Sequence, residues 1–114
     1  MKLPSVEVKE QKADKVVLGL TLACTSEAFE GHFPDKPILP GVVQVDWAMR
    51  FGSLYMDMGE TYAQDLQIKF KKVISPDDIL LLTVQIDREK DKLTFTYCIG
   101  DRIMSSGKIK LGRT

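Results

Sequence analysis

Two residues stand out because their side chains could move protons to and from a substrate, and the first is His32. It is the only histidine among 114 residues, and it lies in a loop that has prolines at positions 34, 37 and 40 and glycines at positions 31 and 41. Prolines restrict the backbone, so such a loop can hold one side chain still. A lone histidine is usually structural, but a fixed imidazole also suits acid or base chemistry near neutral pH.

The second residue is Asp46, the only acid between Asp35 and Asp57, in an otherwise apolar stretch. A buried carboxylate needs a partner or a function. Arg50 lies four residues later on the same helical face, so a simple ion pair is one explanation. The other is proton donation, which needs a desolvated carboxyl and is opposed by a nearby guanidinium. The spacing alone leaves both explanations open.

A helix is predicted to carry Asp46. Pro40 suits a first helical turn, apolar residues follow at most positions as far as Met58, and Gly59 is placed to end the helix. These bounds predict about five turns. Because apolar residues cover nearly the whole circumference, we expect the helix to be enclosed, and only a sheet is available to enclose it. The sequence therefore predicts the α+β class, with one buried helix wrapped by a curved antiparallel sheet.

Strands are predicted on both sides of this helix, from β-branched clusters and from alternation of apolar and polar residues. The run 79–86 is nearly all apolar, so we expect a strand with little solvent exposure, and Gly100-Asp101 indicates a tight hairpin. The residues after position 65 thus predict an antiparallel meander. The predicted strands are Val6–Val8, Val16–Ala23, Asp65–Lys72, Ile79–Ile86, Leu93–Ile99 and Arg102–Leu111.

Composition narrows the function classes. The hydrophobic content of 44% suits one domain over residues 1–114. Sixteen basic residues balance sixteen acidic ones, which disfavours nucleic-acid binding. One histidine and two distant cysteines, Cys24 and Cys98, make a poor zinc site and too few thiols for a disulfide framework. The start has no apolar leader pattern and no stretch of eighteen apolar residues occurs, so we expect a cytoplasmic protein that uses no metal and no cofactor.

The loop and the helix start contain the motif Phe29-x-Gly31-His32-Phe33-Pro34-x-x-Pro37-x-x-Pro40-Gly41-Val42, followed by Asp46. These residues resemble a known family, the 3-hydroxyacyl-acyl-carrier-protein dehydratases of the FabZ and FabA type, and that resemblance implies the hotdog fold. The loop is of the FabZ kind, whereas aspartate at position 46 is the FabA-like choice, and the run 38–48 is most similar to the aryl polyene pathway dehydratases called ApeI. Because of this resemblance we favour the arrangement in which Arg50 turns outward, so that Asp46 acts as an acid or orients water.

The resemblance implies roles for four residues. His32 would be the base that removes the C2 proton of a 3-hydroxyacyl thioester, and Asp46 would assist loss of the 3-hydroxyl as water. The product would be the trans-2-enoyl thioester, in fatty-acid or aryl polyene biosynthesis. Negative charge developing on the thioester oxygen needs hydrogen-bond donors. A helix start offers unpaired N–H groups, so the Gly41 amide is the first candidate donor and the Phe33 amide the second.

The resemblance also implies partners. The substrate would arrive on an acyl carrier protein, and two subunits would form a dimer in which the histidine of one faces the acid of the other. A homodimer is expected, and a heterodimer stays open. Lys69, Lys71 and Lys72, with Lys36 and Arg113, could dock an acidic carrier, although a solvated strand face explains them too. Met49, Met56 and Met58 could line an acyl tunnel or simply fill the core.

Two other functions remain open at this stage. Hotdog proteins also include thioesterases, although the His-Phe-Pro loop weighs against that reaction here. A non-catalytic acyl-binding subunit is the third possibility, in which His32 and Asp46 would be packing residues. The sequence does not decide the acyl chain, the choice between carrier protein and coenzyme A, or the identity of the second subunit.

Overall fold

The computed structural model describes residues 3–21, 38–75 and 79–113. His32, Phe33, Cys24 and Lys36 therefore lie outside the described residues, as does most of the loop that carries the family motif. Seven elements make up the described chain: β1 (Ser5–Gln11), β2 (Lys15–Thr21), α1 (Gly41–Tyr55), β3 (Thr61–Phe70), β4 (Ile79–Asp87), β5 (Lys92–Ile99) and β6 (Arg102–Arg113).

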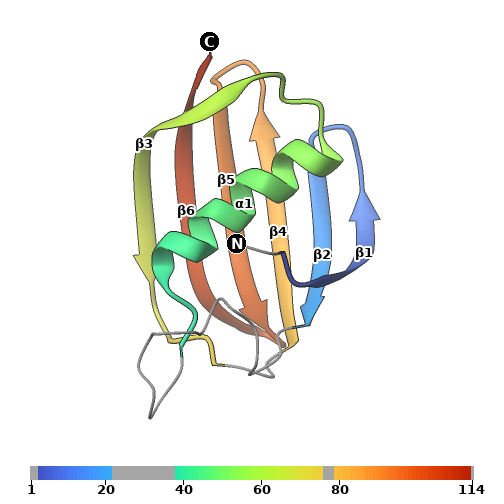
Figure 1. Ribbon diagram of the computed structural model, residues 1–114, viewed down its shortest axis with the longest axis vertical. Coiled ribbons are helices and arrows are strands. Elements are labelled where there is room, and N and C mark those ends of the chain that lie inside the picture. The colour runs from blue at the N-terminus through green and yellow to red at the C-terminus, as the bar shows by residue number, and fades with distance from the viewer. Residues whose placement is uncertain (1–2, 22–37, 76–78, 114) are drawn as a thin grey trace.

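The six strands form one antiparallel sheet in the order β1-β2-β4-β5-β6-β3. Helix α1 crosses one face of this sheet diagonally (Figure 1). Its first turn lies near the end of β3, and its last residue lies near β1, where the Gln11 side-chain amide donates to the Tyr55 carbonyl at 3.0 Å. The predicted α+β class, with one central helix against an antiparallel sheet, is confirmed.

The core lies between the helix and the sheet. Val43, Trp47 and Phe51 follow one another at intervals of four residues, so they form a stripe on the sheet-facing side of α1. The strands meet this stripe with every second residue, as the pleat requires. The buried strand residues are Val16, Leu18, Leu20, Leu80, Leu82, Val84, Ile86, Leu93, Phe95, Tyr97, Met104, Ile109 and Leu111.

The helix differs from the sequence-based expectation in length and enclosure. It ends at Tyr55 instead of Met58, and Met56 and Met58 beyond it are buried in the core. Gly59 has a φ of +67°, but it lies in the connection to β3 and does not end the helix. The prediction that the helix is enclosed on all sides is wrong within one chain, because Val42 is 77% exposed and Leu54 64% exposed.

Two strands are also more exposed than predicted. In β4, buried and exposed residues alternate, and Ile79 and Leu81 lie on the exposed side. The expectation of a strand with little solvent exposure is therefore wrong, because no second layer covers that face within the described chain. Strand β3 lies at the sheet edge and is exposed on both faces, so the apolar residues Leu66 and Phe70 face solvent.

The β5–β6 turn agrees with the sequence-based prediction better than the helix length and the strand exposure do. Gly100 has a φ of +58°, and Ile99 pairs with Arg102 across the predicted two-residue hairpin. Positive φ at the first turn position is what a type II′ hairpin requires, and glycine adopts it without strain. None of the helical segments within the described ranges has both the length and the apolarity needed to cross a membrane.

Candidate active site at the helix start

The candidate site is built on the first turn of α1. Pro40 is the N-cap with extended backbone, and no side chain caps the helix. The N–H groups of Val43 and Gln44 both donate to the Pro40 carbonyl at 3.1 Å. Among the residues that the structure describes, the Gly41 and Val42 amides have no hydrogen-bond partner. Two unpaired donors at the positive end of the helix dipole suit an oxyanion.

A cavity of about 260 Å³ lies beside Gly41. The segment before the helix forms one side of it, and the end of β3 with the residues that follow forms the other. Both sides supply apolar residues, and the second side also supplies two lysines. The lining residues are Ile38, Leu39, Pro40, Gly41, Gln44, Phe70, Lys71, Lys72 and Val73.

Phe70 is part of this site, and sequence reasoning missed it. A Cβ atom built on Gly41 would lie 2.5 Å from the Phe70 Cζ, so the ring occupies the space beside the glycine. The alternation of residues 65–72 places Phe70 on the apolar face, but nothing in the sequence indicates a contact across 29 positions.

The Gly41 contact predicts a context-dependent effect of substitution. Gly41→Ala should cost about 1–3 kcal/mol of unfolding free energy, as overpacking usually does. In a Phe70→Ala background the same change should cost almost nothing, because the ring is gone. Urea unfolding of the four proteins in this cycle measures both effects. An equal cost in the two backgrounds would show that the ring does not restrict position 41.

Gln44 was also missed, although it is the only uncharged polar residue in the first half of α1. It is 3% exposed, and its amide lies between the helix start and the sheet. The side-chain Nε2 donates to the Leu39 carbonyl at 3.0 Å, and the Oε1 accepts from the Ser105 hydroxyl at 2.6 Å. Its main-chain carbonyl accepts from the Tyr97 hydroxyl at 2.7 Å.

The Tyr97 hydroxyl is well suited to remain a donor in this network. Burial raises the pKa of Tyr97 well above its ordinary value, and the negative charge of Asp46 raises it further. The phenol is therefore neutral throughout the physiological pH range. A neutral hydroxyl can donate to the Gln44 carbonyl, whereas a phenolate cannot.

Asp46 lies on a different side of α1, with its side chain 50% exposed. Its Oδ2 is 3.5 Å from the Arg50 Nη1, which is the ion pair that spacing allows one helical turn apart. The expectation that Arg50 turns outward and leaves Asp46 alone is therefore wrong in this structure. The alternative interpretation, in which the two residues pair, agrees with it. A carboxylate in such a pair can still accept a hydrogen bond.

The lysines near the cavity do not form one patch. Lys71 and Lys72 line it, and their N–H groups donate to the Met104 carbonyl at 2.9 and 3.0 Å. Lys69 lies beside a separate cavity, which residues of β3, β5 and β6 line. Arg113 bonds to Asp91 at 2.8 Å and pairs with Thr61, at the end of β3 opposite to Phe70, so it lies away from the helix start. Including Arg113 in this patch was wrong.

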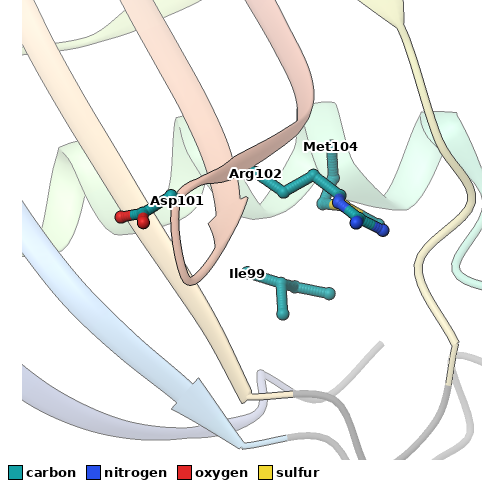
Figure 2. A pocket seen from close by; sticks show the side chains of 4 residues that line it. All are labelled: Ile99, Asp101, Arg102 and Met104. Carbon is teal, nitrogen blue, oxygen red and sulfur yellow. The ribbon is translucent and has the colours of Figure 1, made fainter.

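Met104 also borders a larger cavity of about 700 Å³ at the β5–β6 hairpin (Figure 2). Its other lining residues are Ile99, Asp101 and Arg102. Figure 2 shows the carboxylate of Asp101 and the guanidinium of Arg102 directed to opposite sides of the hairpin. They therefore do not form a joint binding group, and we assign this cavity no role in the chemistry.

The three methionines considered for an acyl tunnel divide into two groups. Met56 and Met58 are buried with the core residues, so core packing accounts for them. Met49 is partly buried and lines a cavity of about 480 Å³ on the outer side of the helix, together with Leu3, Arg50, Ser53, Leu54 and Thr61. No group of three or more metal-ligating side chains occurs within the described part of the chain.

Comparison with known proteins places this chain in a family. The family model described as ApeI-like, ApeI dehydratase, matches residues 8–108, a range that includes the helix start and Asp46. The 3-hydroxyacyl-acyl-carrier-protein dehydratase FabZ of Clostridium perfringens strain SM101 is 31% identical over 113 residues, covering 90% of this chain and 81% of that protein.

Solved structures agree with the family assignment. One chain of the dehydratase heterocomplex ApeI:P from Xenorhabdus doucetiae is 36% identical, with a TM-score of 0.90, and the match covers 99% of this chain and all of that one. Thioesterase superfamily member 2 of Mus musculus has a TM-score of 0.66 at 10% identity, covering 91% of this chain and 78% of that one. The second likeness shows the fold alone and confirms the expected hotdog architecture. On this evidence the chain belongs to the ApeI-like dehydratase family.

Proposed function

We propose that this protein dehydrates a 3-hydroxyacyl thioester to the trans-2-enoyl thioester. The observation that carries the proposal is the helix start of a chain of a dehydratase family, where the Gly41 and Val42 amides are unpaired among the described residues and Gly41 lines a cavity. These amides are donors for the thioester oxygen. These donors stabilise the transition state most in a site that excludes water, because a low dielectric strengthens their interaction with the negative charge that develops on the oxygen.

The reaction needs a base as well as the donors. In this proposal His32 removes the C2 proton, and the resulting enolate is stabilised through its oxygen by the Gly41 amide, with the Phe33 amide as a second donor. The C3–O bond then breaks, and the leaving hydroxide takes up a proton to depart as water. Imidazolium at His32 can supply that proton, so one residue serves first as base and then as acid.

Asp46 has a narrower role here than proton donation. Because it pairs with Arg50 at 3.5 Å, its carboxylate accepts a hydrogen bond from the 3-hydroxyl and orients the leaving group. This interpretation replaces the acid role favoured from the sequence. A half-exposed carboxylate can fill this role in the reaction, since accepting a hydrogen bond does not require the group to be protonated.

The proposal includes a second chain that completes the site. Two features support it: edge strand β3 is exposed on both faces, and the outer side of α1 carries the exposed residues Val42 and Leu54. Unpaired edges and apolar patches of this kind are normally covered. The similar ApeI chain belongs to a heterocomplex, so the second chain is either another copy or a different dehydratase subunit. Asp46 of one chain would then face His32 of the other.

The proposed carrier is an acyl carrier protein, and Lys71 and Lys72 are its candidate contacts beside the cavity. Reversing both charges, Lys71→Glu with Lys72→Glu, should raise KM for a carrier-linked substrate about tenfold and leave KM for a coenzyme A thioester within twofold, because steering acts on the acidic carrier. Steady-state kinetics with both substrates measures this. Lys90→Glu, a charge reversal in the β4–β5 turn, is the control. Equal effects on both substrates would exclude carrier docking here.

The acyl chain is proposed to be an aryl polyene or fatty acyl chain, and the match to the ApeI dehydratase model supports the first. Rates with aryl and alkyl 3-hydroxyacyl thioesters of equal length distinguish them. The cytoplasmic location and the single domain over residues 1–114 stay predictions.

Incubation of the purified protein with 3-hydroxyacyl thioesters tests the function itself. The proposal requires enoyl thioester absorbance to appear without release of free thiol. Release of thiol without enoyl product would identify a thioesterase instead. Absence of both, with the acyl thioester still binding, would identify a non-catalytic subunit and contradict the proposal.

A further inference from the structure

We infer that Gln44 is a positioning residue that sets the location of the Gly41 amide. The inference rests on the proposed function, because it concerns the donor that stabilises the enolate oxygen. It goes beyond that function in naming a buried network behind the helix start on which the donor depends. Three hydrogen bonds converge on Gln44, and each reaches a different element of the fold.

The first bond fixes the segment that leads into the helix. The Gln44 Nε2 donates to the carbonyl of Leu39, two residues before Gly41, at 3.0 Å. The N–H of the same Leu39 donates to the Ile74 carbonyl at 2.7 Å. Leu39 is thus held through both of its main-chain polar groups. Pro40 follows with its φ fixed by the ring, so the position of Leu39 is transmitted to Gly41.

The other two bonds fix Gln44 itself against the sheet. Its Oε1 accepts from the Ser105 hydroxyl of β6 at 2.6 Å, and its main-chain carbonyl accepts from the Tyr97 hydroxyl of β5 at 2.7 Å. Ser105 and Tyr97 are both fully buried, so these bonds are not exchanged with solvent. The helix start therefore has a defined position relative to β5, to β6 and to the segment before the helix.

Only a side chain with both a donor and an acceptor satisfies this arrangement. A glutamate of the same shape could accept from Ser105 but, when ionised, could not donate to the Leu39 carbonyl. A methionine of similar length could do neither and would leave two buried polar groups without partners. An apolar residue would fill the space equally well, so packing alone does not account for an amide at this position.

Gln44→Met is the direct test. We expect kcat for dehydration to fall about tenfold, as a small displacement of an aligned group does, while KM changes less than twofold. Ser105→Ala removes only the hydrogen bond between β6 and the Gln44 side chain and should lower kcat about threefold. This variant tests the inference if Gln44→Met folds poorly. Ile86→Val is the control, because it removes a buried methyl group from the distant end of β4 and leaves the network intact.

A readout that does not depend on activity accompanies the kinetics. In ¹⁵N-labelled protein, the Gly41 amide resonance should shift or broaden in the Gln44→Met and Ser105→Ala variants and stay in place in the Ile86→Val variant. A general loss of stability would instead change resonances throughout the sheet in all three variants. Thermal unfolding of each variant records how much stability is lost.

The outcomes separate this inference from the proposed function. If the wild-type protein forms no enoyl product, the proposed function fails and the role of Gln44 fails with it. If the wild type is active and the Gln44→Met variant keeps the wild-type kcat, only the positioning role is overturned. The same holds if Gln44→Met lowers kcat no more than Ile86→Val does when the two variants lose the same Tm. A selective fall in kcat with a displaced Gly41 resonance supports it.

Discussion

Replacing His32 by Ala is expected to lower kcat by roughly 10³-fold, because general base catalysis by a positioned side chain contributes about 10²–10⁴-fold. The imidazole is the only one in the chain, so no second histidine can substitute for it. Because only a neutral imidazole can take up the C2 proton, the wild-type kcat/KM should rise with pH through the ionisation of His32. That ionisation should vanish in the variant, as measured by enoyl formation across the pH range.

The folded state provides the control for this variant. Thermal unfolding should show a Tm close to that of the wild type, which would separate loss of the base from loss of structure. His32→Gln is a second variant that keeps hydrogen bonding without the ability to take up a proton near neutral pH. If either variant retains more than about a tenth of the wild-type kcat, the histidine is not the base in this reaction.

Asp46→Asn is expected to have the second largest effect, a fall in kcat of about 10²-fold. An amide oxygen accepts a hydrogen bond from the 3-hydroxyl more weakly than a carboxylate does, because the ionised acceptor forms the stronger bond. Stability should change little, since an exposed ion pair one helical turn apart contributes only about 0.3–0.5 kcal/mol. Steady-state kinetics and urea unfolding measure the two effects separately.

Arg50→Gln distinguishes the function of Asp46 from its ion pair. If the pair is only structural, the two substitutions should affect the protein equally. We expect Arg50→Gln to lower kcat about threefold to fivefold, because it leaves the carboxylate in place but orients it less well. Asp57→Asn, which changes an exposed acid beyond the end of α1, should be neutral. Full activity of Asp46→Asn would remove this residue from the mechanism.

The secondary structure was largely predictable because its signals are local. Alternation identified the strands after the helix, and Gly100-Asp101 identified a hairpin whose glycine has positive φ. The predicted meander holds only for β4, β5 and β6, because β3 pairs with β6 and not with β4. The apolar run 79–86 suggested a strand with little solvent exposure, but Ile79 and Leu81 face outward within a single chain. Periodicity reports which residues are apolar and does not report which face of the fold remains uncovered.

The site was predictable only in part. Proline and glycine chemistry located the helix start, so the Gly41 amide was identified as a donor from the sequence. Phe70 and Gln44 were not identified, because their partners are brought close by sheet topology and not by chain spacing. The Ser105 hydroxyl, for example, lies 61 positions after Gln44. The spacing of Asp46 and Arg50 allowed an ion pair, and only the side-chain positions decided that it forms.

A crystal structure with a stable 3-hydroxyacyl thioester analogue tests the central claim most directly. We predict that the thioester carbonyl oxygen lies about 3 Å from the Gly41 nitrogen, the separation expected of an oxyanion donor. His32 should lie beside C2 and an Asp46 carboxylate, from the second chain, beside the 3-hydroxyl. An analogue bound away from the helix start, or His32 and every Asp46 on opposite sides of the assembly, would contradict the account.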